Sequence, residues 1–108
     1  MIARVWHGTT AEWEADRYLD YLKATGVAAL RGTEGNRGVQ VFRRISAGRA
    51  EFFVISLWDS FEAIRRFAGD DIDRAVYYPE DQKYLLALEP KVTHYDVFAE
   101  DLLLEAAA

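Results

Sequence analysis

The chain has 108 residues, of which 51% are hydrophobic and 29% charged, and its formal net charge at pH 7 is -5. This length predicts one domain, and the composition is that of an ordinary globular protein. The negative charge argues against a nucleic-acid surface, and the absence of cysteine excludes disulfides, thiolate metal sites and iron–sulfur clusters.

The N-terminal part of the chain predicts a strand followed by a helix. Residues 2–7 alternate well enough between apolar and polar side chains to form a strand, and Gly8 is expected to end it. Thr9 and Glu12 have the spacing of a capping box, which predicts the start of an amphipathic helix. Gly26 is the natural end of that helix.

A hairpin is predicted next, after a loop over residues 28–38. Residues 39–45 and 50–58 are rich in β-branched and aromatic side chains, and they flank a turn at residues 46–49. The stretch 52–57 is apolar on both faces, which is typical of a central strand that is covered on both sides.

The second half of the chain predicts two more helices and a last strand. Asp59 or Ser60 is expected to cap a long helix that Gly69 ends. A short helix is predicted over residues 79–88, and the last strand over residues 91–98.

The order strand–helix–strand–strand–helix–strand predicts an α+β, ferredoxin-like antiparallel sheet with spatial order 4-1-3-2 and both helices on one face. The open face would expose aromatic side chains unless another sheet covered it. We therefore predict a homodimer with a closed, barrel-like interior. Residues 1–98 are the expected domain, and residues 99–108 are a tail expected to pack on the dimer.

A short motif at the end of the third predicted strand carries a family resemblance. Trp58 and Ser60, on either side of Asp59, match a Trp-x-Ser pattern, and an apolar helix follows. With the element order, this resembles the antibiotic biosynthesis monooxygenase family of dimeric α+β barrels, over residues 1–98. That family includes cofactor-independent oxygenases of polyketide-like aromatics, haem-degrading enzymes, and members of unknown activity.

The resemblance also bears on haem. Trp58 corresponds to a pocket tryptophan of the haem-degrading branch, which also carries an iron-ligating histidine after the second helix. Residues 73–78, the matching region, contain no histidine. Tyr77 or Tyr78 could supply a phenolate ligand in its place, but the departure argues against haem degradation.

The topology suggests where a pocket lies. If strands one and three are parallel neighbours, then Trp6, His7, Trp58 and the start of strand four with His94 converge at one end of the sheet, which makes that end the leading pocket candidate. We expect the side of strand three with Ser56 to form a pocket wall, and the aliphatic and aromatic residues of its other side to pack under the helices.

Histidine is the natural general base near neutral pH, so His94, and after it His7, are candidate catalytic residues. Candidate substrate-binding residues are the aromatic and polar side chains Trp58, Trp6, Ser56, Tyr77, Tyr78 and Arg43. Among them, Arg43 could balance negative charge on a substrate. The structural alternative is that the histidines only satisfy local hydrogen bonds and that Arg43 forms an ion pair.

The favoured function is a monooxygenase-like enzyme, without organic cofactor or metal, that acts on a small aromatic or polyketide-like compound. The alternatives are a non-catalytic homodimer that binds a small hydrophobic molecule, and a haem-binding or haem-degrading protein. No run approaches the roughly 18 apolar residues of a membrane span, and no signal peptide is recognisable. We expect a cytoplasmic protein with no membrane or nucleic-acid partner.

Overall fold

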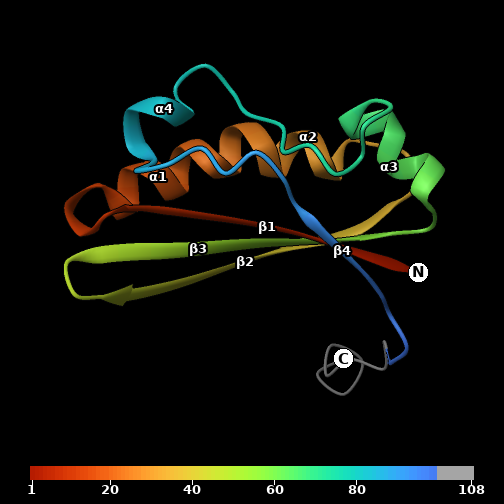
Figure 1. Cartoon of the computed structure of the whole chain (residues 1–108), viewed down its shortest axis with the longest axis horizontal. Coiled ribbons are helices and arrows are strands. Elements are labelled where there is room, and N and C mark those ends of the chain that lie inside the picture. Colours follow the sequence, from red (N-terminus) through yellow and green to blue (C-terminus); the bar gives the residue numbers. More distant parts are fainter. Residues whose placement is uncertain (100–108) are drawn as a thin grey trace.

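The computed structural model describes residues 1–99, which form a four-stranded antiparallel sheet whose helices all lie on one face (Figure 1). The strands are β1 (Ile2–Ala11), β2 (Asn36–Ser46), β3 (Arg49–Trp58) and β4 (Thr93–Asp96). The helical segments are η1 (3₁₀, Glu12–Glu14), α1 (Ala15–Leu22), η2 (π, Lys23–Val27), α2 (Ala28–Arg31), α3 (Phe61–Ala68) and α4 (Asp81–Tyr84). The predicted fold class is confirmed. Residues 100–108, and the packing predicted for them, lie outside the described part of the chain.

The strand order β2-β3-β1-β4 is the predicted one, but the predicted parallel pairing of β1 with β3 is wrong. The two strands are antiparallel, with Ile2 opposite Trp58 and His7 opposite Phe53. The reason is that the helical crossover between β1 and β2 makes these two strands run in the same direction. The hairpin then reverses the chain, so β3 runs opposite to both of them. The start of β1, and not its end, therefore lies beside the end of β3.

The first helical region is longer than predicted and starts later. β1 continues to Ala11 because its pairing with β3 extends to Arg49, so Thr9 lies in the strand and does not cap a helix. The backbone then stays helical from Glu12 to Arg31, with a π turn around Gly26. Gly26 therefore does not end the helix, and part of the predicted loop is helical.

The hairpin and the second long helix match the sequence prediction closely. Ala47 and Gly48 form the turn, both with positive φ, which a tight hairpin requires. Ser60 caps α3 by accepting a hydrogen bond from the Ala63 amide, and Gly69 ends the helix with φ of 83°. The predicted helix over residues 79–88 is shorter, because the chain after α4 is extended and Leu85 bridges to β1.

The face of β3 that packs beneath the helices is not the predicted one. Phe52, Val54, Ser56 and Trp58 are buried beneath the helices, whereas the side chains that alternate with them line the open face and are only half-buried. Polar Ser56 is tolerated inside because it accepts a hydrogen bond from the Trp58 indole. The open face is thus the aliphatic and aromatic one.

The hydrophobic core lies between the sheet and the helices. Tyr18 and Ile64 from the helices are fully buried against Phe52 and Trp58 of β3. The Tyr18 and Phe52 rings meet edge to face, with their centroids 5.2 Å apart. Within residues 1–99, no helix is long and apolar enough to cross a membrane.

Candidate functional site

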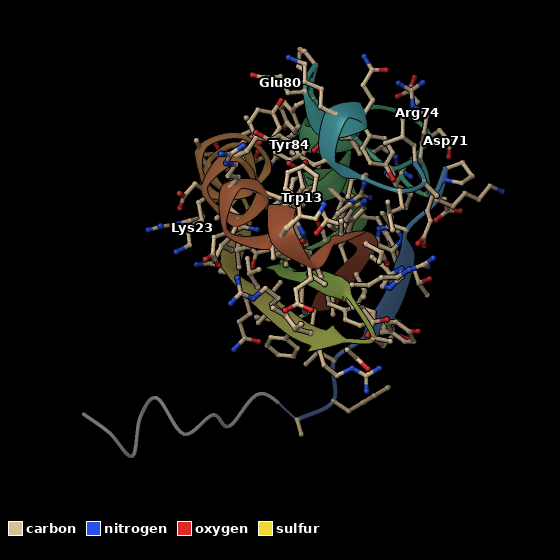
Figure 2. The ribbon with its side chains drawn as sticks, turned by 90° about the vertical axis from the view of Figure 1, so that its left-hand side faces the viewer. Trp13, Lys23, Asp71, Arg74, Glu80 and Tyr84 are labelled. Carbon is tan, nitrogen blue, oxygen red and sulfur yellow. The ribbon has the colours of Figure 1, made fainter. Side chains whose placement is uncertain are left out.

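A cavity lies between the sheet and the helical layer. Its floor comes from β1 and β3, and its walls come from α1 to α2 and from the irregular segment 76–78. Figure 2 views these layers end-on, with Lys23 on one side of the helical layer and Asp71 and Arg74 on the other. The cavity volume is about 50 Å³, which is room for a few water molecules. A ring-sized ligand therefore needs the covering side chains to move apart.

Arg4 is a buried cation on the cavity floor. Its side chain lies on the same face of β1 as Ile2 and Trp6, and the residue is 3% exposed. The guanidinium donates through Nη1 to the Ile72 carbonyl and through Nη2 to the Arg74 carbonyl at 2.9 Å. Burial lowers the pKa of Arg4 to about 10, so the side chain keeps its charge at neutral pH.

The partners of Arg4 are neutral groups. Within residues 1–99, no carboxylate lies within ion-pair distance of its guanidinium, although Asp73 contributes at longer range. The Phe67 ring centroid lies 5.6 Å from the guanidinium carbon, a cation–π contact. Burial of a charge without a counter-charge is unfavourable in a protein interior, so Arg4 is an unusual residue to find here.

His94 lies behind Arg4 and does not line the cavity. Its Nε2 is 3.2 Å from Arg4 Nη1, and its Nδ1 is 3.2 Å from Asp73 Oδ1. Because the guanidinium can only donate, Nε2 accepts, and the proton is on Nδ1. Burial and the neighbouring Arg4 charge lower the pKa of His94, with Asp73 opposing them. A neutral His94 therefore separates Arg4 from Asp73.

Trp6 and Tyr77 form one aromatic wall of the cavity. The Trp6 indole donates to the Tyr77 hydroxyl at 3.3 Å, and that hydroxyl donates to the Glu89 carbonyl at 2.5 Å. The two rings meet edge to face, with centroids 6.3 Å apart. Burial raises the pKa of Tyr77, and Trp6 partly offsets this. This hydroxyl is engaged at both its donor and acceptor positions.

Asp81 is a buried carboxylate on the opposite side of the same cavity. It is 4% exposed, and it accepts hydrogen bonds from the Tyr18 hydroxyl at 3.1 Å and from the Tyr78 amide at 2.6 Å. Burial and the Asp81 charge raise the pKa of Tyr18 and, less strongly, that of Tyr78. Both phenols therefore stay protonated at neutral pH.

Ser56 and Trp58 occupy different positions relative to the cavity. Ser56 lines it, whereas Trp58 is fully buried beside it and donates its indole hydrogen to Ser56 Oγ at 2.8 Å. The Trp58 ring packs against Phe67, with centroids 6.2 Å apart. Trp58 therefore supports the wall and does not form its surface.

His7 lies on the open face, so the predicted convergence of both histidines is wrong. Side chains alternate along β1, and Trp6 points to the cavity while His7 points away from it. Its ring contacts Glu51 at 2.9 Å and Glu89 at 2.6 Å, and lies 4.8 Å from the Phe53 ring centroid. Although burial opposes it, the hydrogen bonds with Glu89 and Glu51 raise the pKa of His7.

Arg43 is also outside the cavity. Its Nη1 lies 2.8 Å from Asp16 Oδ1 at the surface, so the ion-pair alternative describes it. Of the predicted site residues, the cavity brings together Trp6, Ser56, Tyr77 and Tyr78.

Among the cavity residues that the sequence did not indicate, three carry polar or charged groups, namely Arg4, Tyr18 and Asp81. A signal existed for Arg4, because it is a charged residue between Ile2 and Trp6 on one strand face. Tyr18 lies within the predicted amphipathic helix, where nothing distinguishes it from a core residue. Asp81 has no distinguishing signal, since acidic residues are common at helix starts.

Comparison with known proteins extends the fold assignment. No family model and no curated protein matches the sequence. A proposed antibiotic biosynthesis monooxygenase from Bacillus cereus has a similar structure, with a TM-score of 0.65 and 17% identity over 94% of this chain and 95% of that one. This likeness confirms the fold predicted from the resemblance.

Two structures of the protein MhuD are also similar. The haem degrader MhuD of Mycobacterium tuberculosis, with two haems bound in its active site, has a TM-score of 0.58 and 18% identity over 93% of this chain and 98% of that one. A mutant of MhuD with two manganese protoporphyrin IX molecules per active site has a TM-score of 0.57 and 19% identity, over 93% and 97%. At these identities the likeness shows the fold alone.

Proposed function

We propose that the chain is a monooxygenase-like enzyme that acts on a small planar aromatic compound in the cavity between sheet and helices. The observation that carries this proposal is the content of the cavity wall, where aromatic rings surround one buried carboxylate, Asp81. Aromatic walls favour planar ligands by stacking and edge-to-face contacts. A buried carboxylate beside such a ligand is a proton acceptor.

The proposed reaction needs no electrons from outside the substrate. Asp81 takes a proton from an acidic carbon or hydroxyl group, and the resulting anion passes electrons to dioxygen. At a ring methylene, two C–H bonds break and a C=O bond forms. One oxygen atom enters the product and the other leaves as water, so the methylene carbon supplies all four electrons that reduce dioxygen.

Asp81 suits the role of base better than the histidines. His94 Nε2 is occupied by the Arg4 guanidinium and His94 does not line the cavity, so we propose that it positions Arg4. His7 lies on the other face of the sheet, and we propose no chemical role for it. Trp6, Tyr77 and Tyr78 remain the proposed contacts for the aromatic ring.

The alternative proposals are a non-catalytic small-molecule-binding protein and a haem protein. The small volume of the cavity argues against the second of these, since a few water-sized molecules fill it. The residues do not fit haem iron. Within the described part of the chain no histidine lines the cavity, and the Tyr77 hydroxyl already donates to the Glu89 carbonyl. Burial and the Asp81 charge raise the pKa of Tyr78, which disfavours the phenolate that iron would need.

We also propose that the protein is a homodimer whose open sheet faces meet. The half-buried Phe53, Ile55 and Leu57 lie on this face, and Phe42 of the neighbouring strand is 50% exposed. An apolar surface of this kind is normally covered in a stable protein. A second copy would cover it with an identical surface, as a two-fold axis requires.

Oxygen uptake tests the proposed reaction. Purified protein is mixed with anthrone- or quinol-type compounds at an oxygen electrode, and we expect one dioxygen consumed for each molecule of anthrone oxidised. Asp81→Asn should slow turnover by about 100-fold or more, as loss of a general base does, whereas the exposed Asp20→Asn should not. Uptake that Asp81→Asn leaves unchanged contradicts the assigned base.

Haemin addition separates the other two proposals. A Soret band that shifts on addition of protein would support the haem protein and contradict our assignment. Absence of both oxygen uptake and the Soret shift would leave the non-catalytic binding protein.

A further inference from the structure

The charge of Arg4 lacks a counter-charge inside the protein. Its guanidinium is held by two backbone carbonyls and by a neutral imidazole, and none of these groups carries negative charge. The side chain of Asp73, the nearest anion to act on it, is 61% exposed and separated from Arg4 by His94. Solvent therefore screens Asp73, and the positive potential of Arg4 is directed into the cavity.

The hydrogen bonds of Arg4 also leave donors free. A guanidinium has five N–H groups in a planar fork. Within residues 1–99, only N–H groups of Nη1 and Nη2 have hydrogen-bond partners. The remaining donors, on Nε and Nη2, belong to a residue that lines the cavity. This fork matches the oxygen atoms of a carboxylate or a similar planar anion.

The rest of the cavity offers no competing anion for Arg4. Asp81 is the only carboxylate that lines it among the described residues, and it forms no ion pair with Arg4; the Tyr18 hydroxyl and the Tyr78 amide each donate to one of its oxygens, which leaves a lone pair on each. Trp6, Phe67 and Val92 make the surface near Arg4 apolar. A buried cation in such a surface attracts an anionic ligand more strongly than it would in water.

We infer that the cavity selects an aromatic anion, a planar ring bearing an ionised oxygen group that pairs with Arg4. This inference rests on the proposed function only in locating the ligand in the same cavity, and it names the chemical class of that ligand. Arg4 is then the specificity-determining residue. The neutral His94 keeps Arg4 oriented without cancelling its charge.

A matched pair of probes tests the inference. Benzoate and benzamide have the same shape, but only benzoate is an anion at neutral pH. Each is titrated into the wild-type protein while the indole N–H resonance of Trp6 is followed by NMR, because Trp6 lines the cavity. We expect benzoate to bind with a Kd about tenfold to a hundredfold lower than that of benzamide, the range of a charge-assisted hydrogen bond.

Two variants test the role of Arg4. Arg4→Met keeps an unbranched side chain and removes the guanidinium with its charge, so the two probes should bind equally. Arg37→Met is the control, because Arg37 is an exposed arginine paired with Asp59 and does not line the cavity. It should keep the preference for benzoate.

A second pair of variants leaves Arg4 in place. His94→Glu puts a carboxylate against the guanidinium, whereas His94→Gln puts a neutral group of the same size there. We expect His94→Glu to lose the preference for benzoate by about tenfold, and His94→Gln to keep it. This comparison holds even if Arg4→Met does not fold.

Three results would overturn the inference: equal binding of both probes to the wild type, no saturable shift of the Trp6 resonance with benzoate, or an unchanged preference in His94→Glu. These outcomes are independent of oxygen uptake. A protein that prefers benzoate through Arg4 and consumes no oxygen disproves the oxygenase and keeps the anion site. A protein that consumes oxygen without this preference disproves the anion site alone.

Discussion

The indole hydrogen of Trp58 is donated to the hydroxyl of Ser56, two residues earlier on the same strand face, at 2.8 Å. Both residues are almost fully buried, and Ser56 Oγ also lies 3.5 Å from the Arg4 carbonyl. The pair lets β3 place a serine in the core and a tryptophan at its end with no polar atom left unsatisfied. The floor of the cavity depends on this arrangement.

Ser56→Ala should destabilise the protein by about 1–3 kcal/mol, because it leaves the buried Trp58 N–H without an acceptor. Urea unfolding followed by circular dichroism measures this loss, with the exposed Ser46→Ala as control. Adding Trp58→Phe removes the orphaned donor, so the double variant should lose less than the sum of the two single ones. Strictly additive losses would contradict the pairing.

Gly8→Ala should disturb the cavity wall. A Cβ at this position would lie 2.6 Å from Trp6 Cζ2 and closer still to Cη2, so the indole must move. We expect a loss of about 1–3 kcal/mol and a shift of the Trp6 indole resonance as its bond to Tyr77 breaks. An unchanged resonance would show that the indole does not lie over Gly8.

Gly26→Ala should have the opposite effect on stability. Gly26 lies in the π turn of a continuous helical run, and a Cβ there would make ordinary contacts, 3.7 Å from Leu22 Cδ1 and 3.8 Å from Tyr78 Cε2. Alanine loses less backbone entropy on folding than glycine, so we expect a gain of about 0.5–1 kcal/mol. Thermal unfolding measures it, and a lower Tm would contradict the helical run.

The protein should lose stability as the pH rises through the folded-state pKa of His7. The folded-state pKa is raised above the ordinary value near 6.5. The stabilisation by the imidazolium is therefore fully present below about pH 6.5 and is lost as the pH rises through the folded-state pKa. With the side chain 30% exposed, we expect at most about 1 kcal/mol. His7→Gln should remove this decline in urea unfolding curves. The lowered pKa of His94 has the opposite effect, because it makes the protein less stable as the pH falls below about 6.5. This effect should remain in the His7→Gln variant.

Ile55→Glu should abolish the proposed dimer. It places a charge at the centre of the open sheet face, where burial between two copies would be costly. Sedimentation velocity at micromolar protein should give a dimer for the wild type and a monomer for the variant. Leu86→Glu, at a site that is already 53% exposed, should leave the dimer intact. A monomeric wild type would contradict the proposal.

The elements that were predicted well are those fixed by neighbouring residues. The hairpin depends on the turn at Ala47 and Gly48, and α3 depends on its Ser60 cap and on Gly69. Each of these signals acts within a few residues. The strand order followed from connection rules that apply to any chain with this element order.

The errors concern features that depend on distant contacts. Gly26 would end an isolated helix, but here the helical run continues to Arg31 and Gly26 lines the cavity wall. The direction of β3 relative to β1 was inferred wrongly, so the ends of these two strands do not meet as predicted. His7 is outside the cavity because it lies on the open face of β1, whereas its neighbour Trp6 faces inward. The identity of the face beneath the helices could not be read from β3, because both of its sides are apolar.

The candidate site was only half predictable. Its aromatic residues stand out in the sequence, and Trp6, Tyr77 and Tyr78 do meet at the cavity. The inward orientation of Arg4 depends on the Ile72 and Arg74 carbonyls, about seventy positions away in an irregular segment. No local pattern predicts where such a segment folds back.

The central position of β1 has a consequence for how the protein is made. Both of its neighbours, β3 and β4, follow it in the chain, and the last of them ends at Asp96. During synthesis on a ribosome, β1 therefore emerges before both of these neighbours, and until they follow, both of its hydrogen-bonding edges are unpaired. A nascent chain completes its sheet only after β4 has been synthesised.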